Sequence, residues 1–197
     1  MDIFERISKD SGGPIGQYRE RADGYFAFPR LEGEMGPRMT FNGREVLCWS
    51  LNNYLGLANH PEIRRVDAEA AAKYGLAAPM GARMMTGHTR MHEHFEHELA
   101  DFEKKEAAYG FNFGYQGIVS TIDALTTRHD VIVFDSEAHA CLIDGKRLHM
   151  GQSFHFKHND IVSCEQALKK ATEIVNKTGG GILLITEGVF GMTGALG

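Results

Sequence analysis

The sequence has no excess of basic residues, because its 21 lysines and arginines are outnumbered by 26 acids, which gives a formal net charge of −5. A protein that holds nucleic acid through its phosphates needs a basic surface, so nucleic acid is not an expected partner. Cysteine is also scarce: Cys48, Cys141 and Cys164 are widely spaced and form no C-x-x-C pair. This pattern argues against a disulfide scaffold and a cysteine zinc site, and it favours a reducing compartment.

Long apolar runs are missing as well. No stretch approaches the 18 uninterrupted apolar residues of a membrane span, and the charged start MDIFERISKDSGG lacks the apolar core of a secretory signal. We therefore expect no membrane span, no export signal and a cytoplasmic location. With 197 residues, of which 43% are hydrophobic, the chain is long enough to bury a substantial core.

The sequence suggests three segments. Residues 1–37 contain charges, aromatic residues and glycines without a clear period, and they predict an N-terminal arm. In residues 38–60, the dipeptide Asn42-Gly43 lies between two apolar-rich runs. This pattern predicts a β-hairpin at about 38–49 with a tight type I′ turn, followed by a loop. The remaining residues, 61–197, form the third and largest segment.

Helical spacing then alternates with short apolar runs. Helices are predicted at about 61–74, 88–104, 115–125, 138–148 and 161–176. Strands are predicted in AAYGF, VIVF, SFHF and GILLIT, the last of them fully buried. Strands that alternate with helices indicate an α/β fold with a mainly parallel sheet.

Ligands of open α/β sheets bind beyond the carboxyl ends of the strands, where helix N-termini present free N–H groups. The stretches FNFGYQG, DSEAHA and EGVFGMTG follow predicted strands in this way. In the first stretch, Gly114 allows a close backbone approach and Tyr115 opens a helix, so the N–H groups near residues 114–116 are candidates to bind a phosphate. The competing interpretation is a glycine that only eases a strand-to-helix turn.

Three further polar residues each allow two interpretations. His139 lies less than one turn into a predicted helix, where its imidazole either lies flat against an aromatic ligand ring or satisfies local hydrogen bonds. Asn52, in LNNYLGLANHP, either caps its turn or binds a carboxylate. Arg83, in MGARMMTG, either binds an anion or pairs with an acid of a neighbouring chain.

The histidine-rich run GHTRMHEHFEH does not predict a metal site. A zincin pattern H-E-x-x-H that starts at His92 needs a histidine at position 96, where the sequence has glutamate. The four imidazoles are spread around the predicted helix, so a solvated polar helix face is the favoured interpretation.

Taken in order, six blocks resemble the α-oxoamine synthase family, the acyl-CoA-dependent pyridoxal-phosphate enzymes of the aspartate-aminotransferase fold. The blocks are NNYLGLANHPEI, GARMMTGHTRMHEHFEHELADF, GFNFGYQG, DSEAHACLIDGKRL, KHND and TEGVFGMTG. The resemblance covers about residues 40–197. It implies part of the fold type I large domain, with pyridoxal phosphate as the cofactor.

The resemblance also implies roles on the cofactor side of the site. Gly114 and Tyr115 match the family's phosphate-binding turn, and His139 matches the histidine that stacks on the cofactor ring and helps catalysis by steering the substrate carboxylate or proton. Glu187 matches the acid of the last block. Gly191 stands where the family usually has a serine that approaches the cofactor, which puts that single contact in doubt.

On the substrate side, the resemblance places Asn52 near the substrate carboxylate and Arg83 near the dimer interface and the mouth of the active site. The implied reaction is a decarboxylative condensation of serine, glycine or alanine with an acyl-CoA, which gives an aminoketone. The family is expected to act as a homodimer, because its sites are built from both subunits.

The family's Schiff-base lysine and the aspartate that binds the pyridine nitrogen match nothing within residues 1–197. We therefore expect this chain to be an incomplete catalytic half that needs a C-terminal half for activity. The alternative hypothesis is a non-catalytic binding or regulatory subunit that pairs with an active partner.

Overall fold

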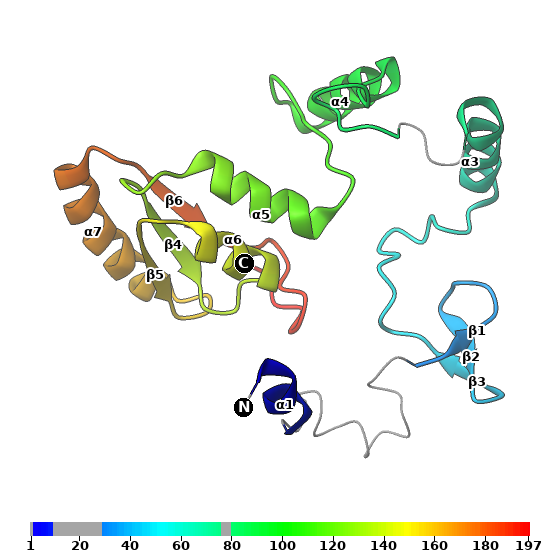
Figure 1. Ribbon diagram of the computed structural model, residues 1–197, viewed down its shortest axis with the longest axis horizontal. Helices are drawn as coiled ribbons and strands as arrows, with labels where there is room; N and C mark the ends of the chain where they lie inside the picture. Colours follow the sequence, from blue (N-terminus) through cyan, green and yellow to red (C-terminus); the bar gives the residue numbers. More distant parts are fainter. Residues whose placement is uncertain (1, 10–28, 76–79) are drawn as a thin grey trace. The chain divides into compact units, whose positions relative to one another are not determined.

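The computed structural model describes residues 2–9, 29–75 and 80–197 (Figure 1). The chain divides into two compact units, residues 1–89 and residues 90–197. Most of the predicted N-terminal arm, residues 10–28, lies outside the described residues. The described part of that arm contains a helix, α1 (Ile3–Lys9), and a short strand, β1 (Leu31–Glu32), neither of which the sequence predicts.

The predicted β-hairpin is confirmed in the first unit. Strands β2 (Arg38–Phe41) and β3 (Arg44–Leu47) pair antiparallel, and β1 adds to the other edge of β2. The connecting residues Asn42 and Gly43 have φ angles of 49° and 71°, the positive values that a type I′ turn requires at both central positions.

The first long helix, α3 (Pro61–Tyr74), is also confirmed with its predicted limits. Pro61 loses nothing at the first turn, where no N–H has an intrahelical partner, and Gly75 ends the helix at a φ of 93°. None of its residues is buried, and Ile63 and Val66 of the apolar stripe are about half exposed.

The second unit contains a parallel sheet, which confirms the predicted α/β fold. Its seven elements are α4 (Arg90–Glu103), α5 (Gly114–Leu125), β4 (Val131–Asp135), α6 (Ala140–Leu148), β5 (Gln152–Phe156), α7 (Ile161–Thr178) and β6 (Ile182–Ile185). The strand order is β5-β4-β6, and both pairs are parallel. The central strand β4 is the most deeply buried part of the unit.

Successive residues of β4 face opposite sides of the sheet and build a core on each side. Val131 and Val133 pack with Ala167 and Ala171 of α7, whereas Ile132 packs with Ile122 of α5. Figure 1 shows α7 along one face of the sheet, with α5 and α6 on the other. The sheet is therefore covered on both faces, as expected for parallel strands.

One strand prediction is wrong, and a second predicted strand is present but less buried than expected. AAYGF (residues 107–111) is irregular: Gly110 N–H donates to the Glu96 carboxylate at 2.7 Å, and Tyr109 packs edge-on against Phe111. Aromatic composition alone does not make a strand, because a strand needs a neighbour to pair with. GILLIT does contain β6. Among the described residues β6 pairs with β4 alone, and Leu184 is 46% exposed, so the strand is not fully buried.

Candidate active site

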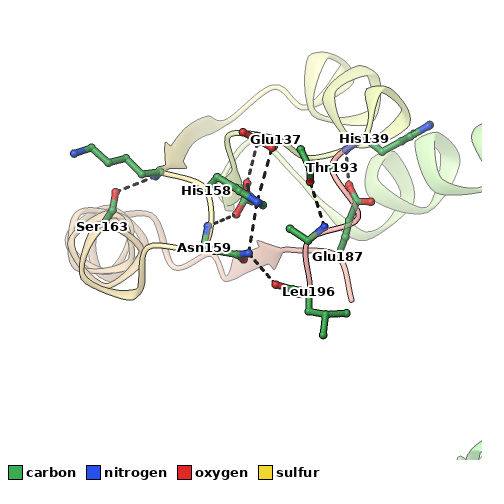
Figure 2. Close-up of polar contacts among 11 residues, drawn as sticks. Glu137, His139, His158, Asn159, Ser163, Glu187, Thr193 and Leu196 are labelled. Atoms are coloured by element: carbon green, nitrogen blue, oxygen red, sulfur yellow. Dashed lines mark hydrogen bonds and ion pairs between the residues drawn. The ribbon is translucent and has the colours of Figure 1, made fainter. Parts of the chain in front are cut away.

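The candidate site lies in the second unit, beyond the carboxyl ends of β4 and β6. The loop after β4 leads to His139, and the loop after β6 carries Glu187 (Figure 2). The N-terminus of α5 meets the same place, because the rings of Tyr115 and His139 lie 6.1 Å apart between centroids. This is the position where an open α/β sheet gathers its ligands.

The start of α5 is open to an approaching group. Phe113 occupies the N-cap position and makes no side-chain hydrogen bond to the helix, so the first-turn N–H groups have no side-chain cap. A Cβ atom at Gly114 would meet no atom within 4 Å. The free backbone N–H groups and the positive dipole end of α5 are therefore accessible to an anionic ligand next to Gly114.

Tyr115 is oriented by helix α6. Its hydroxyl donates to a carboxylate oxygen of Asp144, and Arg147 donates to the other oxygen at 2.6 Å. The hydrogen bond to Asp144 raises the pKa of Tyr115 and lowers that of Asp144. Tyr115 is therefore a neutral phenol whose hydroxyl proton is hydrogen-bonded to Asp144. The rings of Tyr115 and His139 are arranged edge to face, with an interplanar angle of 71°.

His139 is the N-cap residue of α6 rather than a residue inside the helix, which corrects its predicted position. Its Nδ1 accepts the backbone N–H of Cys141 at 3.2 Å. A backbone N–H can only donate, so in the neutral ring the proton is on Nε2. The thiol of Cys141 lies 3.0 Å from the same Nδ1, and burial raises its pKa, so it stays protonated.

Glu187 contacts the backbone of His139. One of its carboxylate oxygens accepts the His139 N–H, which joins two residues that are 48 positions apart (Figure 2). Gly191 follows in the same loop and is exposed, and a Cβ atom there would meet nothing within 4 Å. The serine that the family usually has at this position would therefore fit this backbone without a clash.

Asn52 and Arg83 belong to the first unit. The Asn52 side chain accepts from the Tyr54 hydroxyl at 3.3 Å, while the neighbouring Asn53 caps the loop by accepting from Ala58 N–H at 3.1 Å. Arg83 donates through Nη2 to Nδ1 of His88 at 3.0 Å. The structure brings Tyr115, His139 and Glu187 together. Gly114 precedes Tyr115 at the start of α5, and Gly191 lies in the loop that carries Glu187. The cofactor and substrate roles of all seven residues stay predictions.

Sequence reasoning missed a buried carboxylate at the end of β4. Asp135 is fully buried and accepts hydrogen bonds from the backbone of Glu137 and Asn159 and from the His158 ring. Burial by itself would raise its pKa, but these donors outweigh burial and hold the pKa below its ordinary value. The available signal was an acid directly after the buried run VIVF, since an acid in that place needs partners.

A pocket of about 140 Å³ lies beside the first turns of α5, and Tyr115 is not one of its lining residues. It is lined by Phe111, Asn112, Phe113, Gln116, Gly117 and Ser120. Among the described residues, no group of three or more His, Cys, Asp or Glu side chains is placed to hold a metal ion. Within the same residues, no helix is long and apolar enough to cross a membrane.

The family model for aminotransferase class I and II matches residues 44–196 of the chain. The chain belongs to this family. Cysteate-C-fatty acyltransferase of Capnocytophaga ochracea is 60% identical over 196 residues, which cover 100% of this chain and 46% of that protein. The 8-amino-7-oxononanoate synthase of Alkaliphilus metalliredigens is 39% identical over 170 residues, which cover 86% of this chain and 42% of that protein.

Among solved structures, a serine palmitoyltransferase of Sphingomonas wittichii matches with a TM-score of 0.83 at 25% identity, covering 100% of this chain and 48% of that one. These relatives confirm the resemblance to the α-oxoamine synthase family and to part of its fold type I domain. The chain spans about half the length of the curated relatives it matches. Serine palmitoyltransferase has also been solved with pyridoxal phosphate on this fold.

Proposed function

We propose that the full-length protein containing this chain is a pyridoxal-phosphate-dependent acyltransferase. It would join the fatty acyl group of an acyl-CoA to the α-carbon of a small amino acid, with loss of the amino acid carboxylate. The observation that carries the proposal is the meeting of the open α5 N-terminus with the His139 ring, in a chain of this family. A phosphate and an aromatic ring are the two parts that this arrangement suits.

The residues present fit the cofactor. The first-turn N–H groups of α5 would bind the phosphate, and Gly114 has no side chain to block its approach. The imidazole of His139, 6.1 Å from the Tyr115 ring, would lie against the pyridine ring. Pyridoxal phosphate supplies an electron sink for the negative charge that develops on the substrate α-carbon.

The chain's own residues orient groups rather than form bonds in this proposal. With Nδ1 held by the Cys141 N–H, the Nε2–H of His139 is the donor left to hold the substrate carboxylate. Glu187 fixes the backbone of His139. The covalent lysine and the acid at the pyridine nitrogen would come from the C-terminal half, in a cytoplasmic homodimer, as the family resemblance implies.

Cysteate is the amino acid substrate that we propose first, ahead of serine, glycine and alanine. Support comes from the 60% identity with cysteate-C-fatty acyltransferase over nearly the whole chain. Cysteate has the carbon skeleton of serine, with a sulfonate where serine has a hydroxyl. A site for it therefore has to bind a second anionic group besides the carboxylate.

The test uses the purified full-length protein with palmitoyl-CoA and each of the four amino acids. We expect visible absorbance from bound cofactor, and release of CoA and of labelled CO₂ from carboxyl-labelled cysteate. His139→Ala should lower kcat by about 10²-fold, the size of effect expected when a group that orients the substrate is lost. The exposed His155 of β5 provides the matched control, because His155→Ala removes an imidazole that contacts none of the site residues.

Two results would contradict the proposal at different levels. A preference for serine, glycine or alanine would reject cysteate and leave the reaction class standing. A full-length protein that binds no pyridoxal phosphate would reject the enzyme assignment and favour the non-catalytic subunit.

A further inference from the structure

Two of the three described side-chain hydrogen bonds of Asp135, the buried acid at the end of β4, come from the segment that follows β5. Asp135 Oδ1 accepts from His158 Nδ1 at 3.0 Å, and Oδ2 accepts from Asn159 N–H at 3.0 Å. A third donor, Glu137 N–H, completes the set at 2.8 Å. A fully buried carboxylate accepts but does not donate, so Nδ1 of His158 has to carry a proton.

His158 is held between two carboxylates and one aromatic ring. Besides Asp135, a Glu137 carboxylate oxygen lies 3.8 Å from its Nε2. The Phe190 ring contacts the imidazole edge-on, with centroids 4.4 Å apart and an interplanar angle of 85°. Both acids and the ring restrict His158 to one orientation, so its position depends directly on Asp135.

This cluster anchors the loop that follows β6. Phe190 is 1% exposed, and its buried ring is the contact that His158 makes with the loop. Asn159 Nδ2 donates to the Leu196 carbonyl at 2.8 Å (Figure 2). The loop is closed on itself by Phe190 N–H to Ala195 O at 2.9 Å and by Gly194 N–H to Phe190 O at 2.7 Å. It is therefore a compact unit held at two points by His158 and Asn159.

The same loop carries Glu187, which accepts the backbone N–H of His139. Displacement of Phe190 would move Glu187 and release the N-cap turn in which His139 sits. From these contacts we propose that Asp135 and His158 are positioning residues for His139, acting through Phe190 and Glu187. The proposal rests on the proposed function for the importance of His139, but the contacts themselves do not depend on it.

The experiment uses the full-length protein and three variants. His158→Ala removes both the donor to Asp135 and the contact with Phe190. His158→Asn restores a donor near the position of Nδ1. Asn159→Gly removes the amide that donates to Leu196 O and lies 3.5 Å from His158 Nε2, and it keeps the backbone N–H that donates to Asp135. Glycine suits position 159, because Asn159 has a positive φ of 52°. His155→Ala on the preceding strand is the matched control.

Three readouts are compared: the NMR signal of His139 in protein labelled at histidine Cε1, the visible circular dichroism of bound cofactor, and kcat with KM. We expect His158→Ala to shift the His139 signal, to change the cofactor dichroism and to lower kcat about 10- to 100-fold, as a misplaced group does. His158→Asn should recover most of each change. Asn159→Gly should produce the same changes at smaller size.

A merely structural role gives a different pattern. If His158→Ala lowers the melting temperature while the His139 signal, the dichroism and kcat match the control, the proposal is wrong. If His158→Ala does not fold, Asn159→Gly decides by the same criteria. If even the unsubstituted protein binds no cofactor, the proposed function fails, whereas the His139 signal still tests the positioning claim.

Discussion

The two units of this chain differ in how their apolar residues are used. In residues 90–197, three successive residues of β4, Val131 to Val133, are completely buried between helices on both faces of the sheet. In the described part of residues 1–89, Met39 is the buried hydrophobic residue, while Trp49 is 90% exposed and α3 buries nothing. The spacing of apolar residues thus determines whether a segment forms a helix or a strand. Burial of those residues also requires another element that packs against them.

The largest expected effect comes from matched isoleucines in the two units. Ile132→Ala should lower the free energy of unfolding of the 197-residue chain by about 2–5 kcal/mol, because it leaves a cavity at a fully buried site. Ile63→Ala, at a position 48% exposed, should cost less than about 1 kcal/mol. Denaturant unfolding followed by circular dichroism measures both. Equal losses would show that the contrast between the units does not hold.

A second comparison uses two glycines of the site-forming unit. A Cβ atom at Gly145 of α6 would lie 2.7 Å from Ile122 Cδ1, whereas one at Gly114 of α5 would meet nothing within 4 Å. We expect Gly145→Ala to cost about 1–3 kcal/mol of stability, because overpacking outweighs the helix-propensity gain of alanine. Gly114→Ala should keep or slightly raise the melting temperature.

The same Gly114→Ala variant tests the candidate phosphate site. In the full-length protein it should weaken the binding of pyridoxal phosphate, measured by titration of visible absorbance, because its Cβ occupies space next to the first-turn donors of α5. Unchanged affinity would mean that the phosphate does not approach this turn.

The sequence predicted most accurately those features that neighbouring residues determine. Pro61 and Gly75 limit α3, and Asn42-Gly43 sets the hairpin turn, so each was located from a few adjacent letters. Burial was less predictable: Leu184 has the apolar character of a buried strand residue but lies on an edge strand. Whether a strand is central depends on the order of strands in the sheet, which local patterning does not determine.

For the candidate site, too, the sequence predicts residues in local motifs but not the contacts between residues far apart in the chain. The family blocks predict five site residues that the structure places in one unit: Gly114, Tyr115, His139, Glu187 and Gly191. The sequence does not indicate that Asp135 and His158 form a pair, because they are 23 positions apart and neither has a local pattern that points to the other. The bond between Glu187 and the His139 backbone, across 48 positions, was invisible for the same reason.

A smaller effect is expected from Asp130, which joins two loops of the second unit. It accepts from Gly181 N–H at 2.6 Å and from the Thr127 N–H and hydroxyl at 2.7 Å each, and these bonds lower its pKa to about 2 from 3.8. Because the folded pKa is the lower one, the unfolded chain takes up the proton first as pH falls. The stabilisation is therefore complete above pH 3.8 and is lost as the pH approaches 2.

Asp130→Asn should lower the free energy of unfolding at pH 7 by about 1–2 kcal/mol, since charged hydrogen bonds are replaced by weaker ones. It should also flatten the dependence of stability on pH between 3.8 and 2. Urea titrations at a series of pH values measure both quantities. If the free energy of unfolding of the variant depended on pH between 3.8 and 2 as strongly as that of the unsubstituted chain, the dependence would come from other carboxylates.

The smallest effect compares the N-caps of one helix from each unit. The Asp160 side chain caps α7 by accepting from Ser163 N–H at 2.9 Å, whereas His60, at the N-cap of α3, makes no side-chain bond to its helix. Asp160→Ala should therefore cost about 1 kcal/mol in denaturant unfolding, and His60→Ala close to nothing. His60→Asp should instead add stability to α3, because a carboxylate there can accept first-turn N–H groups and faces the positive end of the helix dipole. If His60→Ala proved as costly as Asp160→Ala, His60 would have to make contacts in solution that its exposed position does not account for.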